Sequence, residues 1–141
     1  MLDLTEERDA HIDQRLREDI VVWLGSVRPD GRPHLALVWF LWNGTAVLIF
    51  SKPGQQKIRN LRQNRFVILA LDNTDRGVDP IILEGEAELL DDPAVDATLP
   101  EYVAKYGARI QRIGYTPKTM AEVYSQAIRI SPTKFYAPPS G

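Results

Sequence analysis

Three apolar runs near the N-terminus are joined by two short turn sequences, and this arrangement is the strongest constraint on the fold. The runs are residues 20–27, 33–42 and 45–51. Pro29-Asp30-Gly31 lies in the first connection, where proline presets φ, aspartate bonds its own backbone and glycine accepts a positive φ. Asn43-Gly44 forms the second connection and is typical of a type I′ hairpin turn. The sequence therefore predicts that the sheet begins as an antiparallel meander.

The rest of the chain adds helices at both ends of this meander and further strands after it. Helices are expected at about 4–18, 55–63, 92–106 and 116–123, with Asp92 and Gly107 as the start and end of the third. Strands are expected at 66–71, 81–89 and 124–136, the last interrupted by Pro132 at an edge or bend. Sequential antiparallel strands with few crossovers favour a small barrel, mainly β with flanking helices. The 141 residues fit one domain, with the barrel over about 20–136.

The second apolar run is apolar on both faces of the strand it predicts. Leu35, Leu37, Trp39 and Leu41 alternate with Ala36, Val38, Phe40 and Trp42. A small barrel fills only one face of a strand, so the other must meet a helix, a ligand or another subunit. The large side chains favour a homodimer.

Charge is unevenly distributed along the chain. Residues 31–71 contain no Asp or Glu but hold six basic residues, whereas the rest of the chain has 11 basic and 19 acidic residues. In a protein of net charge −2, this asymmetry indicates a local anion site or a solvated basic helix face.

The chain has no cysteine, which excludes disulfides and thiol nucleophiles. It has no apolar run of about 18 residues and no signal-peptide pattern, so a cytoplasmic location is expected.

The expected helix at 55–63 is the best candidate for the anion site. Helix starts carry unsatisfied N–H groups and the positive end of the dipole, so a cation there is normally unfavourable. Lys57 lies in or near the first turn with no acid nearby, and is therefore interpreted as an anion ligand. Ser51 and Lys52 could reach the same point from the preceding strand, and Asn60 could add a hydrogen bond. Arg59, Arg62 and Arg65 are interpreted as solvated.

Several segments together resemble the pyridoxamine-5′-phosphate-oxidase-like superfamily of split-barrel flavin and deazaflavin enzymes. They are Gly31-Arg32-Pro33-His34, Leu37-Val38-Trp39-Phe40, Gln56-Lys57-Ile58-Arg59-Asn60-Leu61-Arg62, and, further on, 83–89, 101–107 and 128–134. More narrowly, they are similar to the small members that use the deazaflavin coenzyme F420. The resemblance covers about residues 14–136 and rests on the order and spacing of these segments.

The resemblance implies a six-stranded split barrel that dimerises, with cofactors at the subunit interface. It implies that Val38, Trp39 and Phe40 back the tricyclic ring, while Ser51, Lys52, Gln56, Lys57 and Asn60 hold the phosphate and ribityl chain. Gln55 and Gln56 stand where some relatives carry arginine. The expected activity is hydride transfer from reduced coenzyme F420 to a conjugated small-molecule acceptor. No side chain is assigned as a catalytic acid or as a metal ligand.

Other functions remain open at this point. The same fold could bind FMN as a reductase or oxidase, because both cofactors share the ring shape and a phosphate. A non-catalytic flavin or haem carrier is a second alternative. A nucleic-acid-binding barrel with stacked aromatic residues is a third, although the net charge of −2 opposes it. His11 and His34 lie far apart and lack metal-ligand spacing.

Overall fold

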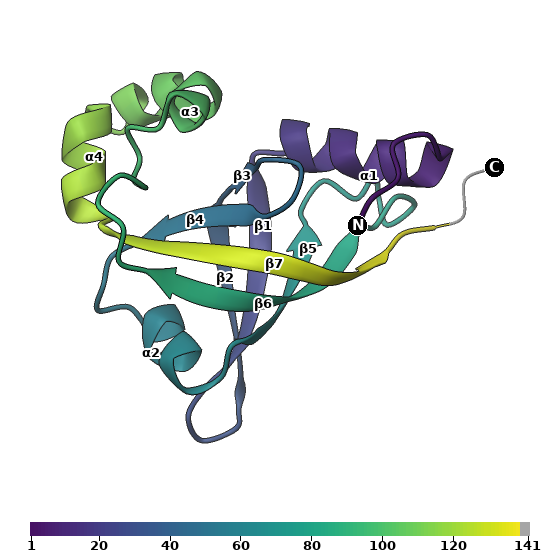
Figure 1. Ribbon diagram of the computed structural model, residues 1–141, viewed down its shortest axis with the longest axis horizontal. Helices are drawn as coiled ribbons and strands as arrows, with labels where there is room; N and C mark the ends of the chain where they lie inside the picture. The colour runs from purple at the N-terminus through teal and green to yellow at the C-terminus, as the bar shows by residue number, and fades with distance from the viewer. Residues whose placement is uncertain (139–141) are drawn as a thin grey trace.

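The computed structural model describes residues 1–138 and shows a strongly curled antiparallel sheet with helices around it (Figure 1). The helices are α1 (Glu7–Glu18), α2 (Gln56–Gln63), α3 (Pro100–Arg112) and α4 (Pro117–Val123). The strands are β1 (Val21–Val27), β2 (Pro33–Trp39), β3 (Leu41–Trp42), β4 (Val47–Ser51), β5 (Phe66–Leu71), β6 (Ile82–Leu90) and β7 (Gln126–Tyr136). None of the helices within residues 1–138 is long and apolar enough to cross a membrane.

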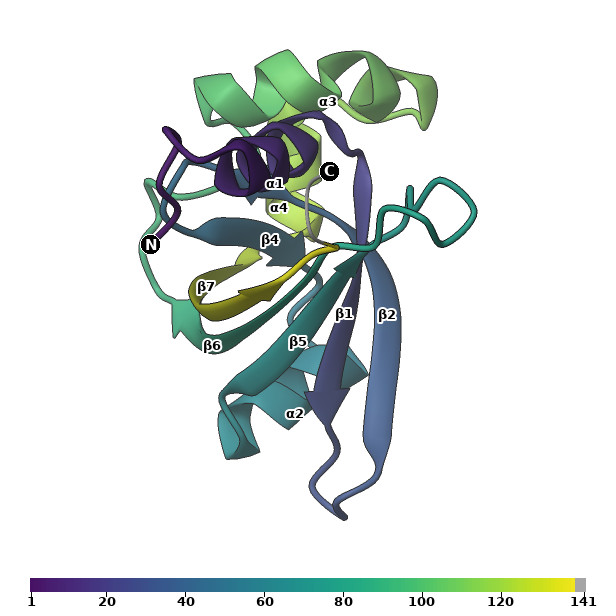
Figure 2. The same cartoon turned by 90° about the vertical axis from the view of Figure 1, so that its right-hand side faces the viewer.

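The order of the strands explains the curl. The sheet runs β2-β1-β5-β6-β7-β4-β3, with every pairing antiparallel. β2 and β3 lie at opposite edges of this sheet, yet Phe40 alone separates them in the chain. Both edges must therefore come together at Phe40, and the sheet forms the half-barrel seen from the side in Figure 2.

Phe40 also accounts for an error in the predicted strand count. The sequence predicted one strand over 33–42 and six strands in all, whereas residues 1–138 form seven. The backbone N–H of Phe40 donates to the Tyr106 hydroxyl (2.9 Å), and its carbonyl oxygen accepts from Lys105 Nζ (2.9 Å). The Tyr106 hydroxyl also lies 2.7 Å from the Phe40 carbonyl oxygen. With its polar groups bound by α3, Phe40 leaves the strand ladder and divides the run in two.

Both predicted turns are present, but one has a different geometry. Gly31 has φ +89°, and its N–H donates to the carbonyl oxygen of Arg28 (2.8 Å). At the second turn, Asn43 Oδ1 accepts from the backbone N–H groups of Thr45 and Ala46. Among these turn residues Gly44 alone has a positive φ, +97°. A type I′ turn needs two such residues, so that prediction is wrong in turn type, though right in position.

The predicted helix at 92–106 is wrong at both ends. Asp92 Oδ1 accepts from the N–H of Ala94, and Asp96 Oδ1 accepts from the N–H of Thr98. These short side-chain-to-backbone bonds form turns that compete with a helix. The helix α3 instead begins at Pro100 and continues through Gly107 to Arg112.

The remaining elements agree more closely with expectation. The first helix begins at Glu7 rather than near residue 4, and the last strand begins at Gln126. Pro132 lies at the predicted bend: Gly85 pairs with Pro132 and Glu84 with Lys134, so the register of β6 and β7 shifts by one residue there.

Two apolar cores lie on opposite sides of β4. Val47 and Ile49 point into the curled sheet, where α1 contributes Ile12 and Leu16 and α2 contributes Ile58. Leu48 and Phe50 point outward, where α3 and α4 cover them with Tyr102, Tyr106, Ile110 and Met120. All five residues of β4 and both residues of β3 are buried, so these two strands are covered on both faces.

By contrast, the outer face of β1, β2 and β5 is apolar and uncovered in this chain. Leu35 is 61% exposed and Phe66 56% exposed, with Leu37 and Ile68 also open. Gly25 lies between them, and a Cβ there would come within 2.7 Å of Ile68 Cγ2, so glycine allows the Ile68 side chain to lie across β1. At Leu35 and Leu37 this face of the predicted strand thus has no helix over it, whereas Trp39 on the same face packs against Tyr106 of α3.

Candidate functional site

The helix α2 is short, and it buries more than its apolar side chains. Ile58 and Leu61 enter the core of the sheet, as expected from their spacing. Lys57 and Asn60 are also buried, at 8% and 0% exposure. The N-cap residue Gln55 makes no side-chain cap, so the first-turn N–H groups of α2 have no such partner. This helix start combines a buried cation with first-turn N–H groups that no side chain caps.

Lys57 is the central cation of this site. Its ammonium donates to Gln55 Oε1, the one acceptor found for it within residues 1–138. Burial lowers the pKa of Lys57 below its usual value, since a charged amine loses hydration inside the protein. An ammonium group has three hydrogens to donate, so Lys57 can serve an anionic ligand as well as Gln55.

The neighbouring polar residues form a closed network behind Lys57. Asn60 Nδ2 donates to Ser26 Oγ (3.0 Å), and Asn60 Oδ1 accepts from Gln56 Nε2 (2.7 Å). Ser51 is fully buried, and its hydroxyl donates to the carbonyl oxygen of Lys52 (2.9 Å). Asn60 thus ties α2 to β1, and the Ser51 hydroxyl, 3.4 Å from Gln55 Oε1, links the end of β4 to the start of α2.

A cavity of about 280 Å³ opens beside this helix start. Its lining includes Val38, Trp39 and Lys57 from the predicted set of site residues, together with Gln55. The cavity lining does not include Phe40, Ser51, Lys52, Gln56 or Asn60. Phe40 is fully buried in the core, and the Lys52 ammonium lies 5.5 Å from the ring centre of Tyr124 at the cavity wall.

Trp39 forms an aromatic wall whose position is set by α3. Its ring stacks on Tyr106 with centroids 4.8 Å apart and an interplanar angle of 8°. Tyr106 is in turn fixed by its hydroxyl, which lies 2.7 Å from the carbonyl oxygens of Ile20 and Phe40. One face of the Trp39 ring is thus occupied by the protein itself.

The opposite wall comes from residues that the sequence did not assign to the site. They are Phe50, Tyr102, Ile113, Met120 and Tyr124, mainly from α3, α4 and the segments beside them. Burial raises the pKa of Tyr102, so its phenol remains protonated at neutral pH. The expected helix at 92–106 contains two tyrosines, Tyr102 and Tyr106, and this pair does not indicate a cavity.

His34 lies close to the same charges. Its pKa is lowered by burial and by the positive charges of Arg28 and Lys57. Its Nδ1 atom is buried and has no hydrogen-bond partner among residues 1–138. His34 therefore remains neutral at neutral pH, and the positive charges beside it are those of Arg28 and Lys57.

A curled antiparallel sheet with a helix start, a buried cation and an aromatic cavity at one side defines a small split-barrel protein. The family model for pyridoxamine 5′-phosphate oxidase matches residues 9–137, and the chain therefore belongs to the pyridoxamine 5′-phosphate oxidase family.

Solved structures share the fold at low sequence identity. An F420 reductase is 24% identical, with a TM-score of 0.65 over 88% of this chain and 94% of that chain. A putative pyridoxamine 5′-phosphate oxidase from Listeria innocua is 21% identical, with a TM-score of 0.73 over 95% of this chain and 100% of its own. HutZ, the heme storage protein from Vibrio cholerae, is 15% identical, with a TM-score of 0.63 over 93% of each chain. No curated protein matches the sequence.

Proposed function

We propose that this protein is a homodimeric oxidoreductase that binds coenzyme F420 and delivers hydride to a conjugated, electron-poor small molecule. The observation that carries the proposal is Lys57, a buried ammonium at the uncapped start of α2, beside a cavity walled by Trp39. Membership of the family does not by itself decide whether the cofactor is F420 or FMN.

The helix start suits the phosphate of such a cofactor. The N–H groups at the start of α2, which no side chain caps, and the positive end of the helix dipole attract an anion. Lys57 adds a full charge that water screens only weakly, because its side chain is buried. Since residues 31–71 contain no carboxylate, nothing in this segment competes for that charge.

The cavity suits part of the ring system. Val38 and Trp39 offer an apolar wall from β2, and Tyr102 and Met120 face them from α3 and α4. At about 280 Å³, the cavity lies near the lower end of the roughly 300–1,000 Å³ that ligand pockets occupy. A second chain would be needed to enclose a cofactor of this size. The cofactor supplies the redox chemistry, and the protein binds and orients it.

The uncovered sheet face supports the dimer. Leu37 belongs both to this exposed apolar face and to the cavity lining. A partner that covered Leu35, Leu37, Phe66 and Ile68 would therefore also reach the rim of the cavity. Burial of such a contiguous apolar face is the usual basis of a stable homodimer.

The test is a parallel titration of the purified protein with coenzyme F420 and with FMN, followed by fluorescence and calorimetry. Tight binding of F420 with weak binding of FMN supports the proposal. Preferential binding of FMN would make the protein a flavoprotein of the same family. Tight cofactor binding with no turnover of any acceptor would favour a carrier, and binding of neither would reject the site.

Two variants connect the titration to the proposed geometry. In Lys57→Ala the dissociation constant should rise about 10- to 100-fold, the equivalent of a lost charge-assisted hydrogen bond. Arg62→Ala is the matched control, because Arg62 is an exposed cation on the same helix and should leave affinity unchanged. Equal affinities for both variants would remove Lys57 from the site.

A further inference from the structure

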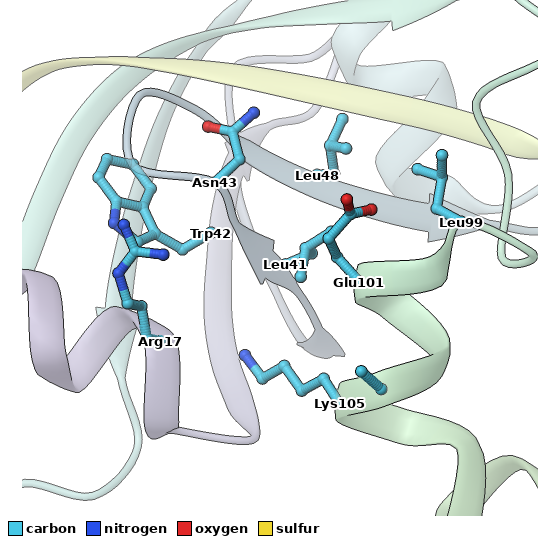
Figure 3. A pocket seen from close by; sticks show the side chains of 9 residues that line it. Arg17, Leu41, Trp42, Asn43, Leu48, Leu99, Glu101 and Lys105 are labelled. Carbon is cyan, nitrogen blue, oxygen red and sulfur yellow. The ribbon is translucent and has the colours of Figure 1, made fainter.

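A second and larger cavity, of about 700 Å³, lies between α1, α3 and the β3–β4 hairpin (Figure 3). Its floor is apolar, formed by Leu41, Trp42, Leu48 and Leu99. Arg17 from α1 and Lys105 from α3 reach toward it from opposite sides in Figure 3. The volume falls within the roughly 300–1,000 Å³ typical of small-molecule sites.

Lys105 is the cation that distinguishes this cavity. Its ammonium donates to the carbonyl oxygen of Phe40 (2.9 Å) and lies 3.9 Å from the centre of the Phe40 ring. No carboxylate within residues 1–138 forms an ion pair with it, although Glu101 stands one turn away on α3. Two of the three ammonium hydrogens therefore have no protein acceptor in the described chain.

The other charged side chains around the cavity are weaker candidates than Lys105 for binding an anionic ligand. Arg17 is paired with Asp13 (2.9 Å), so its guanidinium already has a carboxylate partner. Glu101 is exposed, so water screens its carboxylate. Asp19 is bound by the buried guanidinium of Arg15 (3.0 Å). Lys105 is therefore the cation of this cavity that lacks a carboxylate partner within residues 1–138, and it lies beside an apolar floor.

We propose that this cavity binds a small monocarboxylate with an apolar body, whose carboxylate is held by Lys105 and whose body lies on Leu41, Leu48 and Leu99. A single negative charge matches the single unpaired cation, and the floor has no polar partner for a more hydrophilic molecule.

This site is separate from the candidate cofactor cavity. The two cavities share no lining residue. Between them stand Phe40, which is buried, and Tyr106, which stacks on Trp39. The proposal therefore does not depend on coenzyme F420 binding, and each can fail without the other.

The first experiment is calorimetric titration with 4-phenylbutyrate and with its uncharged analogue 4-phenylbutan-1-ol. The carboxylate should bind about tenfold more tightly than the alcohol, as one charge-assisted hydrogen bond provides. Lys105→Met should remove this preference, while Lys118→Met, an exposed lysine on α4, should retain it. Equal binding of the two compounds to the wild-type protein, or no binding of either, would overturn the proposal.

A second variant keeps Lys105 and its bond to Phe40 intact. Ala104 is exposed on α3 and lines the cavity, so Ala104→Trp should fill the cavity and abolish binding of 4-phenylbutyrate. The melting temperature and F420 affinity of this variant should equal those of the wild type. Unchanged binding of 4-phenylbutyrate to a folded Ala104→Trp protein, or competition of 4-phenylbutyrate with F420, would place the ligand elsewhere and reject the proposal.

The pH dependence gives an independent readout. Burial lowers the pKa of Lys105 to about 8, with Asp19 acting in the opposite direction, and Arg17, Asp13, Glu101 and Tyr106 are the other titratable groups nearby. Affinity for 4-phenylbutyrate should therefore fall as pH rises through about 8, where the free ammonium loses its proton. Constant affinity across this range would contradict the role of Lys105.

Discussion

Replacing Lys57 with methionine should make the protein more stable and worse at binding its cofactor. Lys57 is 8% exposed, and its ammonium has one side-chain acceptor, Gln55, within the described residues. In the absence of a ligand, the folded state therefore carries a charge that has lost most of its hydration. Methionine has a similar length and no charge, so it removes this cost while filling the same space.

The sign of the effect follows from the pKa of Lys57, which burial lowers in the folded state. At neutral pH both the folded and the unfolded protein hold the proton, and the folded state bears the full cost of the buried charge. As pH rises past the folded-state pKa, the folded protein releases the proton first, so the cost shrinks. The advantage of Lys57→Met should thus be greatest at neutral pH and vanish above the unfolded-state pKa.

The expected magnitude is moderate. Loss of a nearly buried, poorly paired charge should stabilise the fold by about 1–2 kcal/mol at neutral pH. For a chain of this length, about 3 °C of melting temperature corresponds to 1 kcal/mol, so the rise should be about 3–6 °C. Differential scanning calorimetry at several pH values measures this shift, and titration with F420 should show the loss of affinity in the same samples.

Lys118→Met provides the control, because Lys118 is exposed and its removal should change the melting temperature little. A lower melting temperature for Lys57→Met, together with unchanged cofactor affinity, would show that Lys57 stabilises the fold and does not hold an anion. That result would refute the assignment of the site.

Three further perturbations test other parts of the structure. Ile68→Asp places a charge on the uncovered sheet face and should raise the dissociation constant of the proposed homodimer at least about 100-fold, as measured by sedimentation; a wild-type monomer, or a variant that dimerises as well as the wild type, would exclude this face. Tyr106→Phe leaves the buried N–H of Phe40 without its acceptor and should cost about 1–3 kcal/mol in urea unfolding, whereas no loss would mean that water replaces the hydroxyl. Gly85→Ala would bring a Cβ within 2.8 Å of Ile130 Cγ2 and should cost about 1–3 kcal/mol by the same assay; a neutral result would show that β6 and β7 can separate there.

The features of the fold that were predictable are those that depend on neighbours in the chain. Pro29-Asp30-Gly31 and Asn43-Gly44 mark the two turns because their conformational preferences are local. The division of the run 33–42 was not predictable, because it is caused by Tyr106, 66 residues further along the chain. Likewise, turns formed by Asp92 and Asp96 displaced the start of α3 to Pro100.

The candidate site also has a part that local sequence predicted and a part that it did not. Lys57 stood out in the sequence because a cation with no acidic neighbour is unusual at a helix start. The structure brings Lys57 to a cavity beside Val38 and Trp39. The opposite wall, including Tyr102 and Tyr124, comes from α3 and the end of α4, whose packing on β4 is set by tertiary contacts. No local pattern indicates which face of those helices meets the sheet.

The single residue between β2 and β3 gives a direct probe of how the protein opens. The amide of Phe40 is protected from solvent by the side chain of Tyr106, whereas its neighbours in β2 are protected by strand pairing with β1. Hydrogen exchange at Phe40 should therefore report the detachment of α3, and exchange in β1 should report the opening of the sheet. Distinct exchange rates at these positions would show that the helix can leave while the half-barrel remains closed.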